Sequence, residues 1–407
     1  FEKSLNGVNR CLPLVQIDLV MAAEKESQQK SHQVSPSSWN RFEECPRKYW
    51  LSRQSLPRKA SMPASMGNVI HNSFEEICKT EIFKEFDYEK GWFEEIVKST
   101  LDKHWEIERD LFMEAPRHPR WKSELHQKAL EGLVVSLKML SEKTTGKTSE
   151  PSEIEPSDWA ETQSNIIANE ATLTSNCGKL MGRLDLLISI KRSGEPEEWI
   201  VADLKTGKPP MSELGPKVSR QLRFYRDILK QNEPDHPILV AEGWYSANQT
   251  THTAEGPSVI EEALEAWEGM TPTQEPLSAT PSQEACTFCE WKPWCPSWWV
   301  ARMEGAIPPG GMFIDEVVNL VRLDHESGAA LFQRAPPSGK NGELAESNHR
   351  FGAILKDGAL EQMKKLVDSI GDDPIFLGSA RVTGKVVHLG DWSEIIPWSP
   401  LLGPVSK

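Results

Sequence analysis

The sequence predicts an α/β protein that begins with helices, continues with antiparallel strands and ends in a separate, small β-rich domain. Apolar residues recur at helical spacing over much of the first 140 residues, whereas strand-like patterns prevail after about residue 160. A polar segment at 141–158, with two prolines, lies between these regions and is expected to be a loop. At 407 residues, the chain is long enough for two or three domains of ~150 residues each.

Composition excludes several classes of protein. Hydrophobic residues make up 38% of the chain and charged residues 26%, which excludes a disordered chain. No stretch approaches the ~20 apolar residues of a membrane-spanning helix, and no secretion signal is evident, so we expect a cytoplasmic protein without a membrane partner. Seven cysteines, an odd number, favour metal or cluster ligation over a disulfide framework.

The N-terminal region is predicted to be helical after a flexible tail at 1–34, where Met21 is an alternative start to Phe1. A helix should begin at Ser35-Pro36, because Ser is a good N-cap and Pro suits the first helical position. A second helix is expected after Gly67. Its apolar stripe comprises Ile70, Phe74 and Ile77, and further helices are expected over 92–105 and 123–140.

The middle region is predicted to form a sheet of antiparallel strands. Strand-like patterns span 161–173, 179–190 and 198–205, and a turn at 193–195 separates the last two. A helix at 218–229 and a strand at 238–245 follow. From Pro308 onward the pattern is rich in strands, with one helix near 359–370, so we expect domains at 35–302 and 308–407.

A cluster of cysteines near residue 290 predicts a metal centre. Cys286, Cys289 and Cys295 have the spacing C-x2-C-x5-C, and three thiolates need a fourth ligand. Cys45 is the best candidate, because nearby cations and aromatic residues favour its thiolate. An iron–sulfur cluster, a zinc ion and unligated thiols all remain open. The single distant cysteine favours the iron–sulfur cluster, since zinc ribbons pair two C-x2-C knuckles.

Two aspartates and a lysine predict a second metal site. Residues two apart on a strand share a face, so Asp203 and Lys205 should point the same way. If the strand that carries Asp185 pairs with theirs, two carboxylates and an ammonium converge. Such a set suits Mg²⁺ or Mn²⁺ and phosphate chemistry, although a D-x-K sequence can also be a surface ion pair.

Basic segments indicate where an acidic protein of net charge −14 could hold a polyanion. Gln221 and Tyr225 fall at i and i+4 on one helix face, within a stretch of net charge +4 from Lys217 to Lys230. His71 lies beside the apolar stripe of its helix, where it can face a site or solvent. The basic residues that we expect to contact DNA are Arg47, Lys48, Arg220, Arg223 and Arg226.

Taken in order, these motifs resemble the RecB-like nucleases of the PD-(D/E)XK superfamily. The resemblance is to the iron–sulfur branch, which includes AddB-type recombination nucleases and CRISPR-associated adaptation nucleases. It implies a restriction-endonuclease-like core, a mixed central sheet flanked by helices, with an iron–sulfur clamp. The motifs that carry it, from residue 35 to about 299, are Ser35-Pro-Ser-Ser-Trp-Asn-Arg-Phe-Glu-Glu-Cys45-Pro, Gly67-Asn-Val-Ile-His71, Gly182-Arg-Leu-Asp185, Asp203-Leu-Lys205-Thr-Gly207, Gln221-Leu-Arg-Phe-Tyr225 and the three cysteines.

The resemblance also implies roles for single residues. Leu184-Asp185 stands in place of the superfamily's PD, Asp203 stands in place of Glu, and Glu170 matches an acidic family position too loosely to be included. By resemblance, the metal ligands are His71, Asp185 and Asp203, and the catalytic lysine is Lys205. Gln221 and Tyr225 would support the site and contact DNA. The ligands of a structural [4Fe–4S] cluster would be Cys45, Cys286, Cys289 and Cys295.

The expected function is therefore a Mg²⁺- or Mn²⁺-dependent deoxyribonuclease. It would hydrolyse phosphodiester bonds at DNA ends or in single strands, as an exonuclease or end-processing enzyme of repair or recombination. The alternatives are a catalytically idle nucleic-acid-binding subunit of a helicase–nuclease complex, a CRISPR adaptation nuclease and a zinc-ribbon interaction protein. No helicase motif occurs, so a helicase partner would be a separate subunit. The segment 308–407 is compatible with an OB-like barrel that binds single strands, or with an accessory domain without a DNA role.

Overall fold

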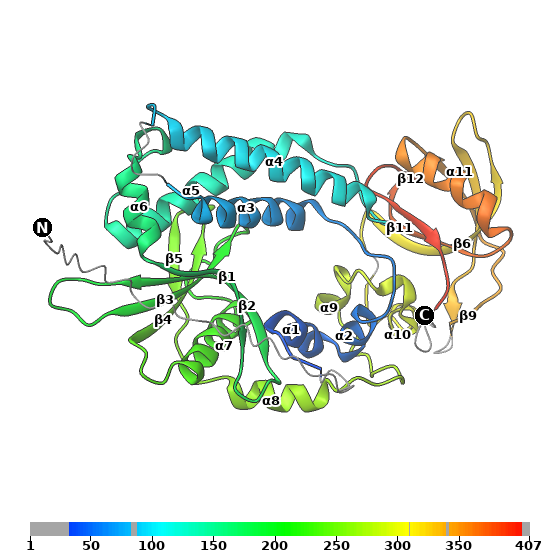
Figure 1. The fold of residues 1–407 in the computed structure, drawn as a ribbon. Helices are drawn as coiled ribbons and strands as arrows, with labels where there is room; N and C mark the ends of the chain where they lie inside the picture. The colour runs from blue at the N-terminus through cyan, green and yellow to red at the C-terminus, as the bar shows by residue number, and fades with distance from the viewer. Residues whose placement is uncertain (1–31, 83–87, 309, 339–341, 401–407) are drawn as a thin grey trace, which may run out of the picture. The chain divides into compact units, whose positions relative to one another are not determined.

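The computed structural model describes residues 32–82, 88–308, 310–338 and 342–400. The predicted tail at 1–34 therefore lies almost entirely outside the described residues. From Gln33 onward the described chain belongs to one unit, whose elements are drawn in Figure 1. Among the helices that these ranges contain, none combines the length and the hydrophobicity that a membrane crossing requires.

The N-terminal half is helical, as predicted. A capping box between Ser35 and Ser38 starts α1, which confirms the predicted helix start. The predicted start of the next helix is wrong: α3 begins at Met62 and runs through Gly67, because buried side chains on both sides of the glycine outweigh its low helix propensity. The helices are α1 (Pro36–Glu44), α2 (Pro46–Ser52), α3 (Met62–Lys79), α4 (Trp92–Glu114), α5 (His126–Thr145) and α6 (Pro156–Ser164).

The loop predicted at 141–158 is shorter than expected. Helix α5 continues to Thr145, and α6 begins at Pro156, which occupies a first-turn position where its missing N–H costs nothing. Between them lies only a short 3-10 turn, Pro151–Glu153. The prolines that suggested a loop therefore mark the starts of two helical segments.

The central sheet is mixed, as the resemblance implied. Its strands lie in the order β1-β2-β3-β4-β5; β1, β2 and β3 are antiparallel, whereas β3 and β4 are parallel. Helix α7 (Pro216–Asn232) makes the crossover between the two parallel strands, as such a pair requires. The strands are β1 (Ile166–Thr174), β2 (Met181–Ile190), β3 (Glu198–Lys205), β4 (Ile238–Tyr245) and β5 (Thr250–Thr253).

Helices cover both faces of this sheet (Figure 1). Leu186, Ile188 and Ile200 pack against α3, α4, α5 and α6, whereas Leu187 and Val201 pack against α1, α7 and α8 (Ile260–Gly269). The alternation along each strand follows from the period of two in strand side-chain direction. The site residues on β2 and β3 are therefore held between two packed layers.

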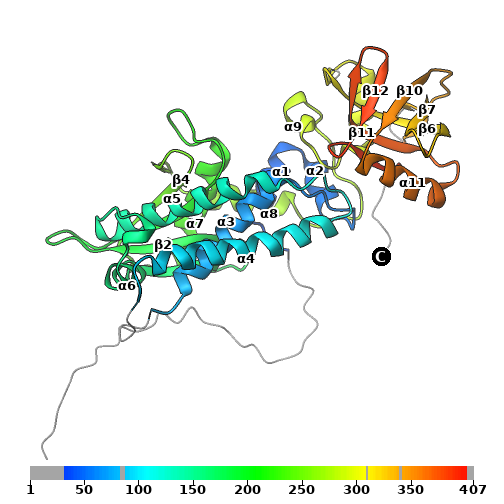
Figure 2. The same cartoon turned by 90° about the horizontal axis from the view of Figure 1, so that it is seen from above.

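Five strands of the C-terminal region close into a barrel, which confirms the strand-rich pattern predicted after Pro308. The order is β12-β10-β7-β6-β11, and β11 also pairs with β12 to close the ring; β10 and β12 are parallel. Figure 2 shows these strands with α11 at one end. The elements are β6 (Phe313–Leu323), β7 (Ala329–Arg334), β8 (Pro337–Ser338), β9 (Glu343–Leu344), β10 (Arg350–Leu355), α11 (Gly358–Ile370), β11 (Ile375–Thr383), β12 (Val386–Leu389) and β13 (Glu394–Pro397).

A tryptophan-rich core joins the barrel to the cysteine segment, which contains α9 (Gln283–Thr287) and α10 (Pro296–Met303). Trp294, Trp298 and Trp299 pack in one buried cluster with residues of α2 and with Phe376 of the barrel. Beside it, the buried Arg117, which follows α4, donates hydrogen bonds to the carbonyl oxygens of Pro57 and Glu290 and forms an ion pair with Glu394 of β13. This cation therefore connects four segments of the chain.

Candidate active site and cysteine-lined cavity

The carboxylate of Asp185 is fixed where β2 and β3 stop pairing. The ladder between the two strands ends at Leu186 and Ala202, and beyond it the N–H of Leu204 donates to Oδ2 of Asp185 at 2.7 Å. The side chain thus takes the place of a backbone acceptor. The two predicted carboxylates come from adjacent, antiparallel strands, as the sequence argument required.

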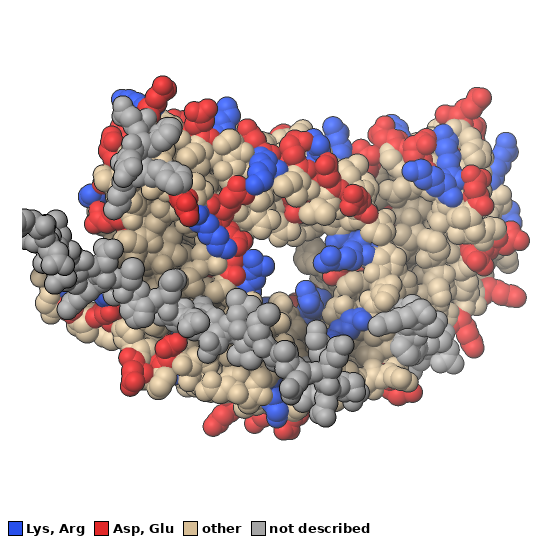
Figure 3. Space-filling model, viewed as in Figure 1, with Lys and Arg blue, Asp and Glu red and all other residues tan. Residues whose placement is uncertain are grey.

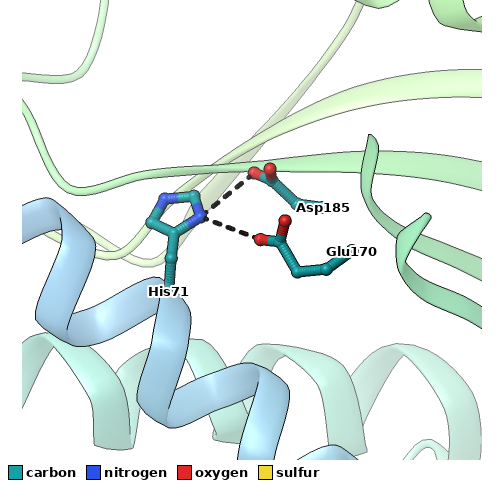
Figure 4. Close-up of side chains that lie close together, drawn as sticks. All are labelled: His71, Glu170 and Asp185. Atoms are coloured by element: carbon teal, nitrogen blue, oxygen red, sulfur yellow. Dashed lines mark ion pairs between the residues drawn. The ribbon is translucent and has the colours of Figure 1, made fainter. Parts of the chain in front are cut away.

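Two further residues complete an acidic group around Asp185. Nδ1 of His71, on α3, lies 3.5 Å from Oδ2 of Asp185 and 3.7 Å from Oε1 of Glu170, on β1. Figure 4 shows the three side chains converging from one helix and two strands. One ligand atom from each lies within 4.8 Å of the others, so the group can hold a metal ion. They border a cavity of ≈ 380 Å³, whose other lining residues are Gly67, Asn68, Asn72 and Arg183.

The electrostatics of this group are those of a site built for a cation. Burial raises the pKa of Asp185 to about 7, and the charge of Asp203 adds to the effect. Burial alone would lower the pKa of His71, but its polar contact with Glu170 and the charges of Asp185 and Asp203 raise it to about 9. Both raised pKa values follow from crowding of carboxylates in a buried place, where a divalent cation would stabilise their charged forms.

Glu170 is the site residue that the sequence analysis left out. Its backbone has φ 53°, a left-handed conformation that is unfavourable for a non-glycine residue within a strand. Its other carboxylate oxygen, Oε2, forms an ion pair with Nε of Arg183 at 2.5 Å. Backbone strain of this kind persists only where the surrounding structure enforces it. Here the strained residue is the one whose carboxylate faces His71. In the sequence, the only sign that Glu170 belongs to the site was its loose match to an acidic position of the family motif.

Asp203, predicted as a metal ligand, lies outside the 4.8 Å group and is tied to the lysine instead. It is buried and forms an ion pair with Lys205, and Oδ1 accepts a hydrogen bond from Nε2 of Gln221 at 2.8 Å. Nζ of Lys205 also donates to Oε1 of Gln221, at 3.3 Å. Burial lowers the pKa of Lys205, but the charge of Asp203, its hydrogen bond with the lysine and the charge of Asp185 together outweigh burial, so the net effect is a raised pKa.

Gln221 and Tyr225 both face the sheet from α7, as their spacing predicted. Nε2 of Gln221 donates to the hydroxyl oxygen of Tyr225 at 3.1 Å. The tyrosine ring lies so close to β2 that a Cβ built on Gly182 would be 2.5 Å from its Cε1 atom. The glycine of the Gly182-Arg-Leu-Asp185 motif therefore makes room for Tyr225, and through it for the Gln221–Asp203 contact.

The structure places most of the predicted DNA-contacting residues in structural contacts. Arg223 and Arg226 donate to backbone carbonyl oxygens in the segment 254–257. Arg220 bonds to the side chain of Asn40 and lies over Trp39, 4.3 Å from the ring centroid. The side chains of these arginines therefore point away from α7 in directions different from that of Gln221. The remaining two, Arg47 and Lys48, line the cysteine cavity described next.

The four predicted cluster ligands surround one small enclosed cavity. Cys45, Cys286, Cys289 and Cys295 all line it, together with Arg47, Lys48 and Lys292. Burial raises the pKa of the Cys289 thiol to about 11 and that of Cys295 to about 12. Among the described residues, no three of these thiols have their sulfur atoms within 4.8 Å of one another. The thiols therefore lie around a space rather than against each other.

Lys and Arg side chains, with some Asp and Glu side chains among them, lie at the rim of an opening in the molecule. Figure 3 shows the opening, and comparison with Figure 1 places it between α3 and the α1–α2 pair. Helix α3 carries His71, and α2 follows Cys45. The opening thus lies between the elements that supply the two candidate sites.

Comparison with protein families identifies the superfamily of the site-bearing region. The family described as the PD-(D/E)XK nuclease superfamily matches residues 33–296, which is more than half of the chain and includes all the site residues described above. None of the curated proteins matches the chain.

Proposed function

The chain belongs to the PD-(D/E)XK nuclease superfamily, and on that premise we propose that it is a metal-dependent deoxyribonuclease acting on single strands or DNA ends. The observation that carries the proposal is the convergence of His71, Glu170 and Asp185 beside the Asp203–Lys205 pair. Membership of the superfamily suggests a metal-dependent phosphodiesterase. The preference for DNA ends or single strands is the part that we add.

The residues around the acidic group fit a divalent cation. His71, Glu170 and Asp185 would hold Mg²⁺ or Mn²⁺, which accept carboxylate oxygens, and Mn²⁺ also tolerates an imidazole nitrogen. When bound, such an ion supplies Lewis acidity and positive charge where phosphodiester hydrolysis develops negative charge. The hydrogen bond from the N–H of Leu204 keeps Asp185 aimed at the site.

Lys205 would act on the substrate through its ammonium group. Its Nζ is positioned by Asp203 and by Oε1 of Gln221, so it is held on the side of β3 that faces the acidic group. From there it can donate a hydrogen bond to a phosphate oxygen and stabilise the charge that develops in the transition state. Gln221 and Tyr225 restrict the rotamers of this pair and are positioning residues.

Substitution of the Asp203–Lys205 pair tests this assignment. Asp203→Asn and Lys205→Met should each lower cleavage of a labelled oligonucleotide by about a hundredfold or more, the effect of losing one transition-state interaction in comparable sites. DNA binding in EDTA should stay within a few fold of wild type. Lys147→Met removes an exposed ion pair with Asp158 and is the matched control. Substantial cleavage by both site variants would refute the assignment.

The preference for single strands or ends is supported by the Lys and Arg side chains at the rim of the opening between α3 and α1–α2 (Figure 3). A DNA strand can be threaded through such an opening only if it has a free end. We therefore expect Mg²⁺- or Mn²⁺-dependent cleavage of a linear single-stranded oligonucleotide and little cleavage of the same oligonucleotide circularised by ligation. Equal rates on both would contradict the proposed preference for ends.

We also propose that the cysteine-lined cavity holds a structural iron–sulfur cluster. The support is the soft donor set of four thiols that line one small cavity. The single distant cysteine, Cys45, also differs from a zinc ribbon, which pairs two C-x2-C knuckles. A cluster here would join α2 to the segment between Cys286 and Cys295 and contribute directly to the free energy of unfolding.

Anaerobic purification with analysis of iron, sulfide and zinc tests the cluster. Wild type should be coloured and contain iron and sulfide, and Cys289→Ser should be colourless and less stable to urea. Cys177→Ser, at an exposed cysteine, is the control that should keep both properties. Stoichiometric zinc without iron would show that the cavity is a zinc site.

A further inference from the structure

The strands of the C-terminal barrel have an unusual charge distribution. The chain as a whole has a net charge of −14, yet β7, β10, β11 and β12 contain no Asp or Glu. These four strands and the turn between the last two instead carry a set of basic residues, namely Arg334, Arg350, Arg381, Lys385 and His388.

Most of these basic residues lie on one outward surface. The inward side chains of the same strands, such as Phe332, Leu355 and Leu389, form the core of the barrel. The residues between them point outward, because strand side chains alternate. Register places Arg381 opposite His388, and His388 opposite Ile354. The acid-free strands are neighbours in the barrel, as Figure 2 shows for β12, β10 and β7.

This surface also offers an aromatic ring. Phe313, at the start of β6, pairs in register with Arg381 and is 43% exposed. Gly352, in the middle of β10, is exposed, and a Cβ built on it would meet no atom within 4 Å. A chain of unpaired nucleotides can therefore approach the strands closely, with a base on the ring and its phosphates near the cations.

Arg334 does not belong to this set. It lies 3.8 Å from Glu316 in an ion pair and over the ring of Phe351. In contrast, Arg350, Arg381 and Lys385 are exposed. Arg350 makes a surface hydrogen bond to Oε1 of Gln333 at 3.3 Å, which orients it along the sheet.

We propose that the outward face formed by Phe313, Arg350, Arg381, Lys385 and His388, the barrel face, binds single-stranded nucleic acid. This inference rests on the proposed nuclease function and adds to it a second strand-binding site, separate from the acidic group on the central sheet. Charge complementarity supports a polyanion, and the exposed ring supports unpaired bases, which a duplex would not offer. Five-stranded barrels of the OB type bind oligonucleotides through comparable surfaces.

Binding by the full-length protein in EDTA tests the proposal without cleavage. The probe is a fluorescein-labelled oligothymidylate of roughly 30 nucleotides, longer than the ~4–16 that one such barrel covers. Arg350→Glu with Arg381→Glu should weaken binding at least about tenfold and lower the salt slope by about 1.4, since each lost phosphate contact lowers it by about 0.7. Phe313→Ala should weaken binding several fold and leave the slope unchanged.

The matched control is Lys364→Glu with Lys365→Glu, which changes the net charge equally on α11 of the same domain. An unchanged slope in the Arg350/Arg381 variant would overturn the proposal, as would equal weakening by the control variant. Stronger competition by a blunt duplex than by the unlabelled single strand would overturn it too.

The same variants separate this proposal from the nuclease function. The Arg350/Arg381 variant should cleave a short oligonucleotide with Mn²⁺ at the wild-type rate. If wild type cleaves nothing and the salt slope still falls in the variant, the nuclease proposal fails and the barrel face stands. If cleavage is present and the slope is unchanged, the barrel face fails alone.

Discussion

The buried cation Arg117 offers the sharpest test of how the parts of this chain are held together. Its side chain is 2% exposed and pairs with Glu394, 10% exposed, on the last strand of the barrel sheet. Its nitrogens also donate to the carbonyl oxygens of Pro57, at 3.1 Å, and Glu290, at 2.8 Å. The guanidinium lies 4.7 Å from the ring centroid of Trp294. Arg117→Met would keep the volume of the side chain and remove all these polar contacts.

The expected cost follows from the groups left behind. Breaking a buried ion pair by removing one partner costs about 3–5 kcal/mol, because the remaining charge is uncompensated. Glu394 would keep Lys59 at 2.8 Å, which favours the lower end of that range for the pair. The two carbonyl oxygens would lose their donors, at about 1–3 kcal/mol each where water cannot replace them. With the lower end of each range, we therefore expect a loss of about 5 kcal/mol in the free energy of unfolding.

Urea unfolding followed by tryptophan fluorescence measures this loss. Lys59→Met is the control, because Lys59 is 37% exposed and pairs with the same carboxylate, so it should cost less than about 1 kcal/mol. The double variant Arg117→Met/Glu394→Gln should cost clearly less than the sum of its single variants, since the two groups interact directly. A loss below about 1 kcal/mol for Arg117→Met would refute the reasoning.

Three further predictions concern single contacts. Glu170→Gln should weaken Mn²⁺ binding, measured by calorimetry, at least about tenfold, because it removes one charged ligand; unchanged affinity would exclude Glu170 from the metal site. Gly182→Ala should lower the free energy of unfolding in urea by about 1–3 kcal/mol, because the new Cβ would lie 2.5 Å from Cε1 of Tyr225. Gly215→Ala, with open space around it, is its control and should change stability little. Ser35→Ala should cost about 1 kcal/mol in thermal unfolding through loss of the α1 capping box, and no change would show that the cap is dispensable.

Local patterns in the sequence predicted several elements at the right residues. The strands expected at 198–205 and 238–245 have those bounds as β3 and β4, because each is a buried apolar run that ends at a turn. Asp203 and Lys205 face the same way, since the period of two is a property of the backbone. Strand bounds and side-chain directions of this kind can be predicted from one segment alone, without knowledge of the rest of the chain.

Long-range packing decided where the chain uses its other polar residues. Arg223 and Arg226 look like free cations in sequence, yet both donate hydrogen bonds to carbonyl oxygens 34 and 30 residues away along the chain. The spacing of side chains on a helix fixes which residues share a face, and it does not fix what packs against that face. Predictions of DNA contacts from basic residues alone are weak for this reason.

The sequence by itself determined the order of the motifs, the family that they resemble and the strand that carries the aspartate–lysine pair. Only the tertiary structure decided that Glu170 joins His71 and Asp185. It enters because α3, almost 100 residues earlier in the chain, places His71 beside β1, and because the backbone of Glu170 is held at φ 53°. The barrel likewise contains a parallel pair, β10 with β12, whose strands are separated in sequence by α11 and β11. Both results depend on contacts between segments distant in sequence, which hydrophobic periodicity does not encode.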